Sequence, residues 1–103
     1  MTPLEWTDPA VADLENSQDY LSRDSSEYAN TVIDRLIHSA ERLKSFPESG
    51  RLVPEAAPAK VREIRLDTFR LFYRVRRGRA QILAVIHSAR NLGGMTPKPW
   101  DAA

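Results

Sequence analysis

Residues 60–87, KVREIRLDTFRLFYRVRRGRAQILAVIH, decide the fold, because they contain three strand-like segments separated by short turns. The predicted elements are, in order, a strand over 60–66, a turn at 67–69, a strand over 70–76, a turn at Arg77-Gly78 and a strand over 79–87. Glycine adopts positive φ without steric cost, so the second turn suits a tight hairpin. The stretch 82–86 contains no polar side chain, which predicts a central strand buried on both faces. We therefore expect a three-stranded antiparallel meander.

A helical hairpin is predicted upstream of this meander. Asp8-Pro9 is expected to begin the first helix, since aspartate caps free amides and proline suits the first helical position. This helix should end near residues 22–23, and a capping-box pattern at residues 24–27 begins the second helix. The apolar stripes are Val11, Leu14 and Leu21 in the first helix, and Ala29, Val32, Ile33, Leu36, Ile37, Ala40 and Leu43 in the second.

The remaining segments complete a single α+β domain. Residues 3–7 alternate apolar and polar side chains, which predicts a short first strand. Residues 51–59 contain two prolines and are expected to form a loop. The predicted fold is a short N-terminal strand, a helical hairpin and a three-stranded antiparallel meander, with the helices packed on one sheet face. Residues 1–90 are expected to form the domain, and residues 91–103 an irregular C-terminal tail.

The charge of the chain divides into two parts. The net charge over 103 residues is +1, but residues 1–50 hold four basic and ten acidic groups, whereas residues 51–90 hold ten basic and three acidic ones. Twelve of the 15 basic residues are arginine, whose planar fork suits phosphate and carboxylate groups. The basic part is therefore either a surface for an anionic partner, nucleic acid or an acidic protein segment, or the complement of the acidic part within the fold.

Composition excludes several classes of protein. With 42% hydrophobic and 28% charged residues, the chain is globular rather than disordered. The absence of cysteine excludes disulfides, thiolate catalysis and cysteine zinc sites, and two histidines are too few for a multi-histidine metal centre. We expect no cofactor and no metal. No apolar run approaches the roughly 20 residues of a membrane span, and no signal-peptide pattern is present, so we expect a soluble, cytoplasmic protein.

Strand alternation predicts which side chains face away from the helices. The core-facing set is Arg62, Ile64 and Leu66 on the first meander strand and Leu71, Tyr73 and Val75 on the second, and the open-face set is Glu63, Arg65, Arg70, Phe72, Arg74 and Arg76. Arginines interleaved with an aromatic side chain fit a nucleic-acid surface, and they fit equally well a docking site for an acidic, amphipathic peptide.

Three further features have two interpretations each. His87, expected on one face with Leu83 and Val85, is either a structural residue at a strand end or a general acid or base with an ordinary pKa of about 6.5. Glu63 and Arg65 form either a base with a phosphate clamp or an ordinary cross-strand ion pair. Trp100 either covers apolar surface or contacts a partner.

Several residues together resemble the RelE/ParE superfamily of toxins from bacterial toxin–antitoxin modules. The matching residues, spread over about 4–90, are Trp6-Thr7, Ala12-Asp13-Leu14, Asp19-Tyr20-Leu21, Leu43, Phe46-Pro47, Gly50-Arg51, Arg62-Glu63-Ile64, Arg70–Val75, Ile82–His87 and Arg90. The resemblance implies a toxin that a cognate antitoxin neutralises. It also implies one of two activities: ribosome-dependent cleavage of messenger RNA in RelE-like members, or inhibition of DNA gyrase in ParE-like members.

The closing His87-Ser88-Ala89-Arg90 resembles the ParE branch, and no tyrosine follows Tyr73 to complete a RelE-like set. The leading hypothesis is a gyrase inhibitor without catalytic residues. Its target- or antitoxin-binding residues would be Arg65, Arg70, Phe72, Arg74, Arg76, Arg90 and Trp100. The alternative hypothesis is an mRNA endonuclease that uses His87, Arg65, Arg74 and Glu63. A third is a non-toxic family member that only binds its antitoxin.

Overall fold

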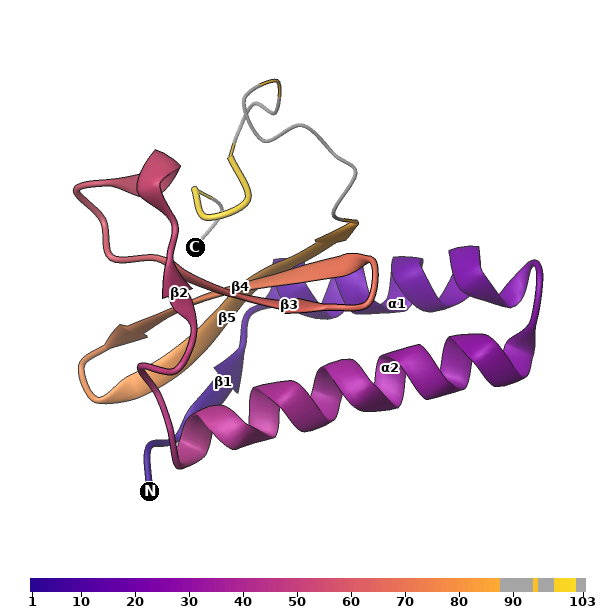
Figure 1. The fold of residues 1–103 in the computed structure, drawn as a ribbon, viewed down its shortest axis with the longest axis horizontal. Coiled ribbons are helices and arrows are strands. Elements are labelled where there is room, and N and C mark those ends of the chain that lie inside the picture. The colour runs from indigo at the N-terminus through magenta and orange to yellow at the C-terminus, as the bar shows by residue number, and fades with distance from the viewer. Residues whose placement is uncertain (88–93, 95–97, 102–103) are drawn as a thin grey trace.

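The computed structural model describes residues 1–87, 94 and 98–101, which form an α+β fold with two helices packed on one face of a mixed sheet (Figure 1). The sheet has the strand order β1-β5-β4-β3-β2. Its strands are β1 (Leu4–Trp6), β2 (Arg51–Leu52), β3 (Arg62–Leu66), β4 (Phe69–Arg76) and β5 (Arg79–His87). β1 runs parallel to β5, and the other neighbours are antiparallel. The predicted fold class and the meander are confirmed, with β5 as the central strand expected.

The prediction of a loop over residues 51–59 is wrong for the first two residues, because they form β2. They pair with Arg62 and Glu63 of β3, and the Val53 amide continues the contact by donating to the Val61 carbonyl at 2.9 Å. The prolines begin only after this pairing. The rest of the segment crosses the sheet face opposite the helices and includes a short 3₁₀ turn at Pro54–Ala56.

Helices α1 (Asp8–Ser22) and α2 (Ser26–Glu41) form the predicted hairpin, and a 3₁₀ turn at Arg42–Lys44 extends the second. α1 begins one residue earlier than the sequence predicts, and α2 begins one residue later. Thr7 rather than Asp8 caps α1, because its hydroxyl also donates to the Ile82 carbonyl at 2.7 Å and so ties the helix start to β5. Ser25 rather than Asp24 caps α2, with its hydroxyl accepting from the Tyr28 amide at 3.1 Å.

The larger apolar core lies between the helices and the sheet. Its buried members are Ala10, Val32, Ile33, Leu36, Ala40, Leu43, Phe69, Leu71, Tyr73, Ala80, Ile82 and Val85. Two residues of the predicted helical stripes are instead exposed, Val11 at 40% and Ile37 at 38%. In α1 the sheet-facing stripe includes Ala10, the neighbour of Val11, because adjacent residues are turned by about 100° around a helix.

A smaller apolar cluster covers the opposite sheet face. It consists of Val53, Ala56, Val61, Phe72, Leu83, Ala84 and Ile86, with Trp100 packed against it. The loop after β2 and the segment at 98–101 lie over this face in Figure 1. The sequence prediction of an open second face is therefore wrong in part. Its centre is a second core, and only its margins are accessible.

A register shift at Phe72/Tyr73 changes the facing of residues in β5. Phe72 pairs with Ala84 and Tyr73 pairs with Ile82, which leaves Leu83 as an extra residue in a β-bulge. Leu83 therefore belongs to the smaller cluster, whereas Val85 belongs to the larger one. The predicted face shared by His87, Leu83 and Val85 is correct for Val85 and wrong for Leu83.

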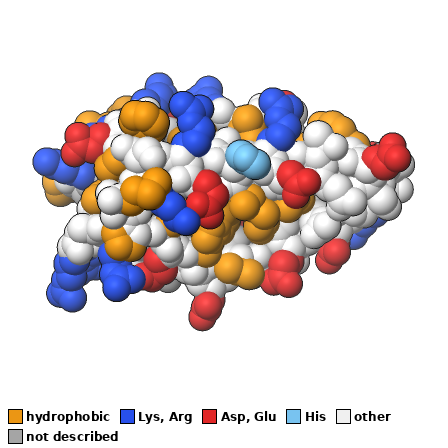
Figure 2. Space-filling model, turned by 90° about the horizontal axis from the view of Figure 1, so that it is seen from below, with side chains coloured by type: hydrophobic (Ala, Val, Ile, Leu, Met, Phe, Trp, Pro, Cys, Tyr) orange, Lys and Arg blue, Asp and Glu red, His pale blue; other side chains and the backbone are white. Residues whose placement is uncertain are grey.

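The helix-covered side of the molecule carries a mixed surface. Figure 2 shows apolar side chains near the middle of this side, with acidic and basic side chains around them. Among the helices of the described residues, none is both long and apolar enough to cross a membrane. Arg90 and most of the predicted tail lie outside the described residues.

Candidate functional site

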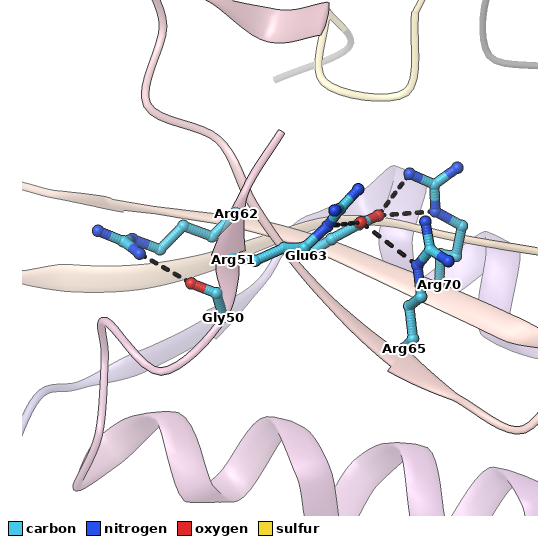
Figure 3. A network of polar contacts seen from close by, with 6 residues as sticks. All are labelled: Gly50, Arg51, Arg62, Glu63, Arg65 and Arg70. Atoms are coloured by element: carbon cyan, nitrogen blue, oxygen red, sulfur yellow. Dashed lines mark hydrogen bonds and ion pairs between the residues drawn. The ribbon is translucent and has the colours of Figure 1, made fainter. Parts of the chain in front are cut away.

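A buried carboxylate surrounded by arginines forms the most elaborate polar cluster among the described residues (Figure 3). The side chain of Glu63 is fully buried, and its two oxygens take ion pairs from three strands. Oε1 lies 2.6 Å from Arg51 Nε of β2 and 3.4 Å from Arg65 Nε of β3. Oε2 lies 2.6 Å from Arg70 Nε and 2.5 Å from Arg70 Nη2 of β4. We call these four residues the Glu63 cluster.

The Glu63 cluster has an excess of two positive charges. Burial by itself raises the pKa of Glu63, but hydrogen bonds from Arg51 and Arg70 and the charges of both outweigh it, so the pKa is held below its usual value. Glu63 is therefore ionised at neutral pH. The side chains of Arg51 and Arg65 remain 62% and 60% exposed, so the excess charge is presented to solvent.

The inner side of the cluster is packed against aromatic rings. Arg70 places its guanidinium carbon 5.0 Å from the centre of the Phe72 ring, and the Trp100 ring meets Phe72 edge-on at 5.8 Å. Arg70 is 7% exposed and Phe72 is fully buried. The prediction that both lie on an exposed face is therefore wrong. Strand alternation gives the correct side of the sheet, but it does not report what covers that side.

Arg62 faces the helix side, as predicted, and lies at the sheet margin. Its guanidinium donates to the Gly50 carbonyl at 2.8 Å and to the Glu48 carbonyl at 3.2 Å, turned away from the Glu63 cluster (Figure 3). Beneath it, the buried Tyr73 hydroxyl accepts from the Gly50 amide at 2.8 Å and donates to the Pro47 carbonyl at 2.9 Å. These contacts fix the chain as it enters β2, and so position Arg51.

A second polar chain lies nearer the β4–β5 turn. Arg74 Nε donates to Gln81 Oε1 at 2.9 Å, and the Gln81 amide donates to Glu5 Oε1 at 3.3 Å. Arg79 lies 3.9 Å from the other oxygen of Glu5. Arg76 is exposed on the same sheet face. Of the predicted arginines that the structure describes, Arg70 is buried, whereas Arg65, Arg74 and Arg76 have access to solvent.

His87 lies on the opposite sheet face from the Glu63 cluster. It pairs with Phe69 across the strands, and the two rings meet edge-on at 5.5 Å. Here α1 and the end of β5 form a cleft of about 420 Å³, lined by Asp13, Asn16, Ser17, Tyr20, Phe69, Val85, Ile86 and His87. The Asp13 carboxylate of α1 accepts a hydrogen bond from the Val85 amide at 3.0 Å. This bond gives a partner to a backbone amide of β5 that lies beyond the part of the strand paired with β1.

The structure brings Glu63, Arg65 and Arg70 together and leaves His87 on the other side of the sheet. Arg51 is a member of the Glu63 cluster that was not predicted, because it falls in a segment interpreted as a loop. Its pairing with the residue at 63 depends on strand register, and no local pattern in the sequence signals it. The described residues contain no group of three or more histidine, cysteine, aspartate or glutamate side chains suited to a metal ion.

Comparisons with known proteins relate this small α+β fold to toxins of toxin–antitoxin systems. The model of the family described as ParE toxin of type II toxin-antitoxin system, parDE, matches residues 4–92. Toxin RelE2 of Caulobacter vibrioides is 34% identical over 91 residues, which are 87% of this chain and 99% of that protein.

Two solved structures share the fold. A chain of the chromosomal ParDE toxin–antitoxin system from P. aeruginosa superposes with a TM-score of 0.71 and 28% identity, over 84% of this chain and 96% of that one. A chain of the RelBE2 toxin–antitoxin complex from Mycobacterium tuberculosis superposes with a TM-score of 0.62 and 21% identity, again over 84% of this chain and 96% of that one. This second similarity shows a shared fold only. The chain belongs to the ParE toxin family of type II toxin–antitoxin systems.

Proposed function

We propose that this toxin inhibits DNA gyrase by binding it, carries out no reaction of its own, and is neutralised by a cognate antitoxin. The observation that supports this most strongly is the separation of its candidate acid–base groups. His87 packs against Phe69 on the helix-covered face, whereas Glu63, Arg65 and Arg74 lie on the other face. A residue that moves a proton must reach the reacting atom within hydrogen-bonding distance, directly or through one water.

The state of Glu63 also argues against its acting as a base. A general base works best when its pKa is near the operating pH, but the arginines lower the pKa of Glu63 and occupy both of its oxygens. Within the described part of the chain, the sheet face that carries Glu63 has no histidine or tyrosine that could act as the base in place of Glu63. The cluster is suited to hold arginines in place for binding a partner.

For the antitoxin we propose two contact regions. The similar structures from P. aeruginosa and M. tuberculosis are toxin–antitoxin assemblies. In this chain, the cleft between α1 and the end of β5 offers Phe69, Val85 and the 62%-exposed Tyr20 to an apolar side chain of a partner helix. The exposed fork ends of Arg51 and Arg65 offer charge-assisted hydrogen bonds to partner carboxylates.

The test is a supercoiling assay with purified toxin, gyrase and relaxed plasmid, with and without antitoxin. We expect dose-dependent loss of supercoiling or accumulation of cleaved DNA, reversed by antitoxin. His87→Ala should inhibit gyrase like the wild type, and so should the matched variant His38→Ala, which changes an exposed histidine on α2. Absence of any effect on gyrase at toxin concentrations that arrest growth would contradict the proposal.

The second candidate is ribosome-dependent cleavage of messenger RNA, and the observation that favours it is the similarity to Toxin RelE2. Translating ribosomes incubated with toxin would then give cleaved mRNA by primer extension. His87→Ala or Arg65→Ala would abolish the cleavage while leaving the fold intact by circular dichroism. Growth that is unaffected by overexpression would instead indicate a family member that only binds its antitoxin.

A further inference from the structure

The β4–β5 hairpin ends in a concentration of positive charge. Four of the six residues from 74 to 79 are arginine, namely Arg74, Arg76, Arg77 and Arg79. Arg76 and Arg77 are exposed, and no acidic side chain of the described residues lies within ion-pair distance of either. The Arg79 side chain is 59% exposed, and the one ion pair that it makes with the described residues, to Glu5, is long at 3.9 Å. The tip therefore presents charge that the folded chain does not neutralise.

The backbone of the tip is held in a tight two-residue turn. Arg76 pairs directly with Arg79, and the two residues between them have positive φ, 54° at Arg77 and 74° at Gly78. This turn type favours asparagine, aspartate or glycine at its first position, because a Cβ atom costs roughly 1–2 kcal/mol in the left-handed region unless a short polar side chain hydrogen-bonds locally. Arginine at residue 77 thus carries a backbone cost. Conformational preference therefore does not account for arginine at this position.

We propose that this hairpin tip, comprising residues 74–79, binds the phosphate backbone of double-stranded DNA. A two-stranded β-ribbon has the width that the major groove admits, and arginine is well suited to phosphate oxygens. Single-stranded nucleic acid is bound mainly on aromatic platforms, and residues 74–81 contain no aromatic side chain. An acidic peptide would need apolar contacts, but the only exposed large apolar side chain at the tip is Val75, at 42%.

The contact is expected to be independent of base sequence. Arginines that meet phosphates fix position on a duplex without reading its bases. The contact goes beyond gyrase inhibition and does not depend on it, because the tip would bind free duplex as well as the DNA held by a target enzyme. Arg74 would be the least adaptable member, since Gln81 already holds its Nε. Arg76 and Arg77 are the residues whose removal tests the proposal.

The magnitude follows from counterion release. Each phosphate neutralised contributes about 0.9 to the slope of log affinity against log salt, which amounts to about eightfold in affinity at 0.1 M relative to 1 M salt. Loss of two such contacts should therefore weaken binding by about 60-fold at 0.1 M salt. It should also lower the slope by about 1.8.

The experiment measures fluorescence anisotropy of a labelled 20-base-pair duplex titrated with purified toxin between 50 and 300 mM NaCl. The test variant is Arg76→Gln with Arg77→Gln. The matched control is Arg23→Gln with Arg42→Gln, which removes the same charge from two exposed arginines of the helical hairpin. We expect the tip variant to bind at least tenfold more weakly with a reduced salt slope, and the control to bind within about threefold of the wild type.

Three results would overturn the proposal. The first is the absence of duplex binding by the wild type at 50 mM salt. The second is an equal loss in both double variants, which would indicate net charge alone. The third is unchanged DNA affinity of the tip variant together with weakened antitoxin binding by calorimetry, which would assign the tip to an acidic protein surface. Since no arm contains gyrase, these results are separate from the test of gyrase inhibition.

Discussion

Replacing Glu63 with glutamine should destabilise the fold by about 3 kcal/mol, because it leaves a buried arginine without a counter-charge. The side chain of Glu63 is fully buried, and that of Arg70 is 9% exposed. Removing one partner of a buried ion pair costs about 3–5 kcal/mol. Glutamine keeps the shape and one acceptor oxygen, and Arg51 and Arg65 can turn to solvent, so we expect the lower end of this range.

The cost of Glu63→Gln should depend on pH in a defined direction. The pKa of Glu63 is lower in the folded chain than the ordinary value of about 4.3, so the stability that its charge contributes is complete above that value. This contribution is lost as the pH falls through the lowered pKa. The stability difference between wild type and variant should therefore be constant from about pH 5 to 8 and shrink in stronger acid.

Urea unfolding followed by circular dichroism measures this difference. With a slope of about 1.5 kcal/mol per molar urea, 3 kcal/mol lowers the midpoint by about 2 M. The matched control is Glu5→Gln. The Glu5 side chain is 43% exposed, and its polar contacts with other described side chains are long, at 3.3 and 3.9 Å, so its loss should cost less than about 0.5 kcal/mol. A Glu63→Gln midpoint within 0.3 M of the Glu5→Gln midpoint, or a difference that does not shrink in acid, would refute the reasoning.

Three further substitutions test the packing that supports the sheet, each by urea unfolding. Gly50→Ala should cost about 2–3 kcal/mol, because the added Cβ would lie 2.7 Å from the Tyr73 hydroxyl and 2.8 Å from the Glu63 carbonyl oxygen; no loss would mean that both the ring and the backbone can move aside. Tyr73→Phe should cost about 1–3 kcal/mol, since it removes the partner of the Gly50 amide and of the Pro47 carbonyl; a cost below 0.5 kcal/mol would contradict these bonds. Trp100→Ala should cost about 1 kcal/mol through loss of the edge-on contact with Phe72, and unchanged stability would argue that the contact contributes nothing.

The strands and helices could be predicted because their signals are local. The apolar stripe of α2 and the alternation in β3 and β4 each repeat within a few residues, and the turn at Arg77-Gly78 needs only one glycine. The start of α1 differs from its predicted position by one residue for a non-local reason. Thr7 is the cap of α1 because Ile82, 75 residues away, accepts its hydroxyl proton.

The composition of the Glu63 cluster could be predicted only in part, because it depends on register and on coverage. Alternation places Glu63 and Arg70 on one face, but it does not show that the loop after β2 and Trp100 cover the apolar centre of that face or that both residues are buried. Arg51 enters the cluster through the pairing of β2 with β3, which no short pattern encodes. The position of Leu83 was wrong because one bulge residue shifts every later side chain of a strand to the other face.

The two faces of the sheet are suited to different tasks. On the helix side, His87 and Asp13 both line a cleft whose wall also includes Phe69 and Val85, a shape that favours a partner's side chain. On the other side, buried aromatic rings and the ionised Glu63 hold Arg70 in place, so Arg51 and Arg65 project from a rigid base and not from a flexible surface. Rigid presentation lowers the entropy lost when a partner binds. The arginine-rich hairpin tip lies beyond both regions. An antitoxin that occupies the cleft and pairs with Arg51 and Arg65 would therefore leave the tip accessible. The DNA affinity of the toxin–antitoxin complex should then equal or exceed that of free toxin.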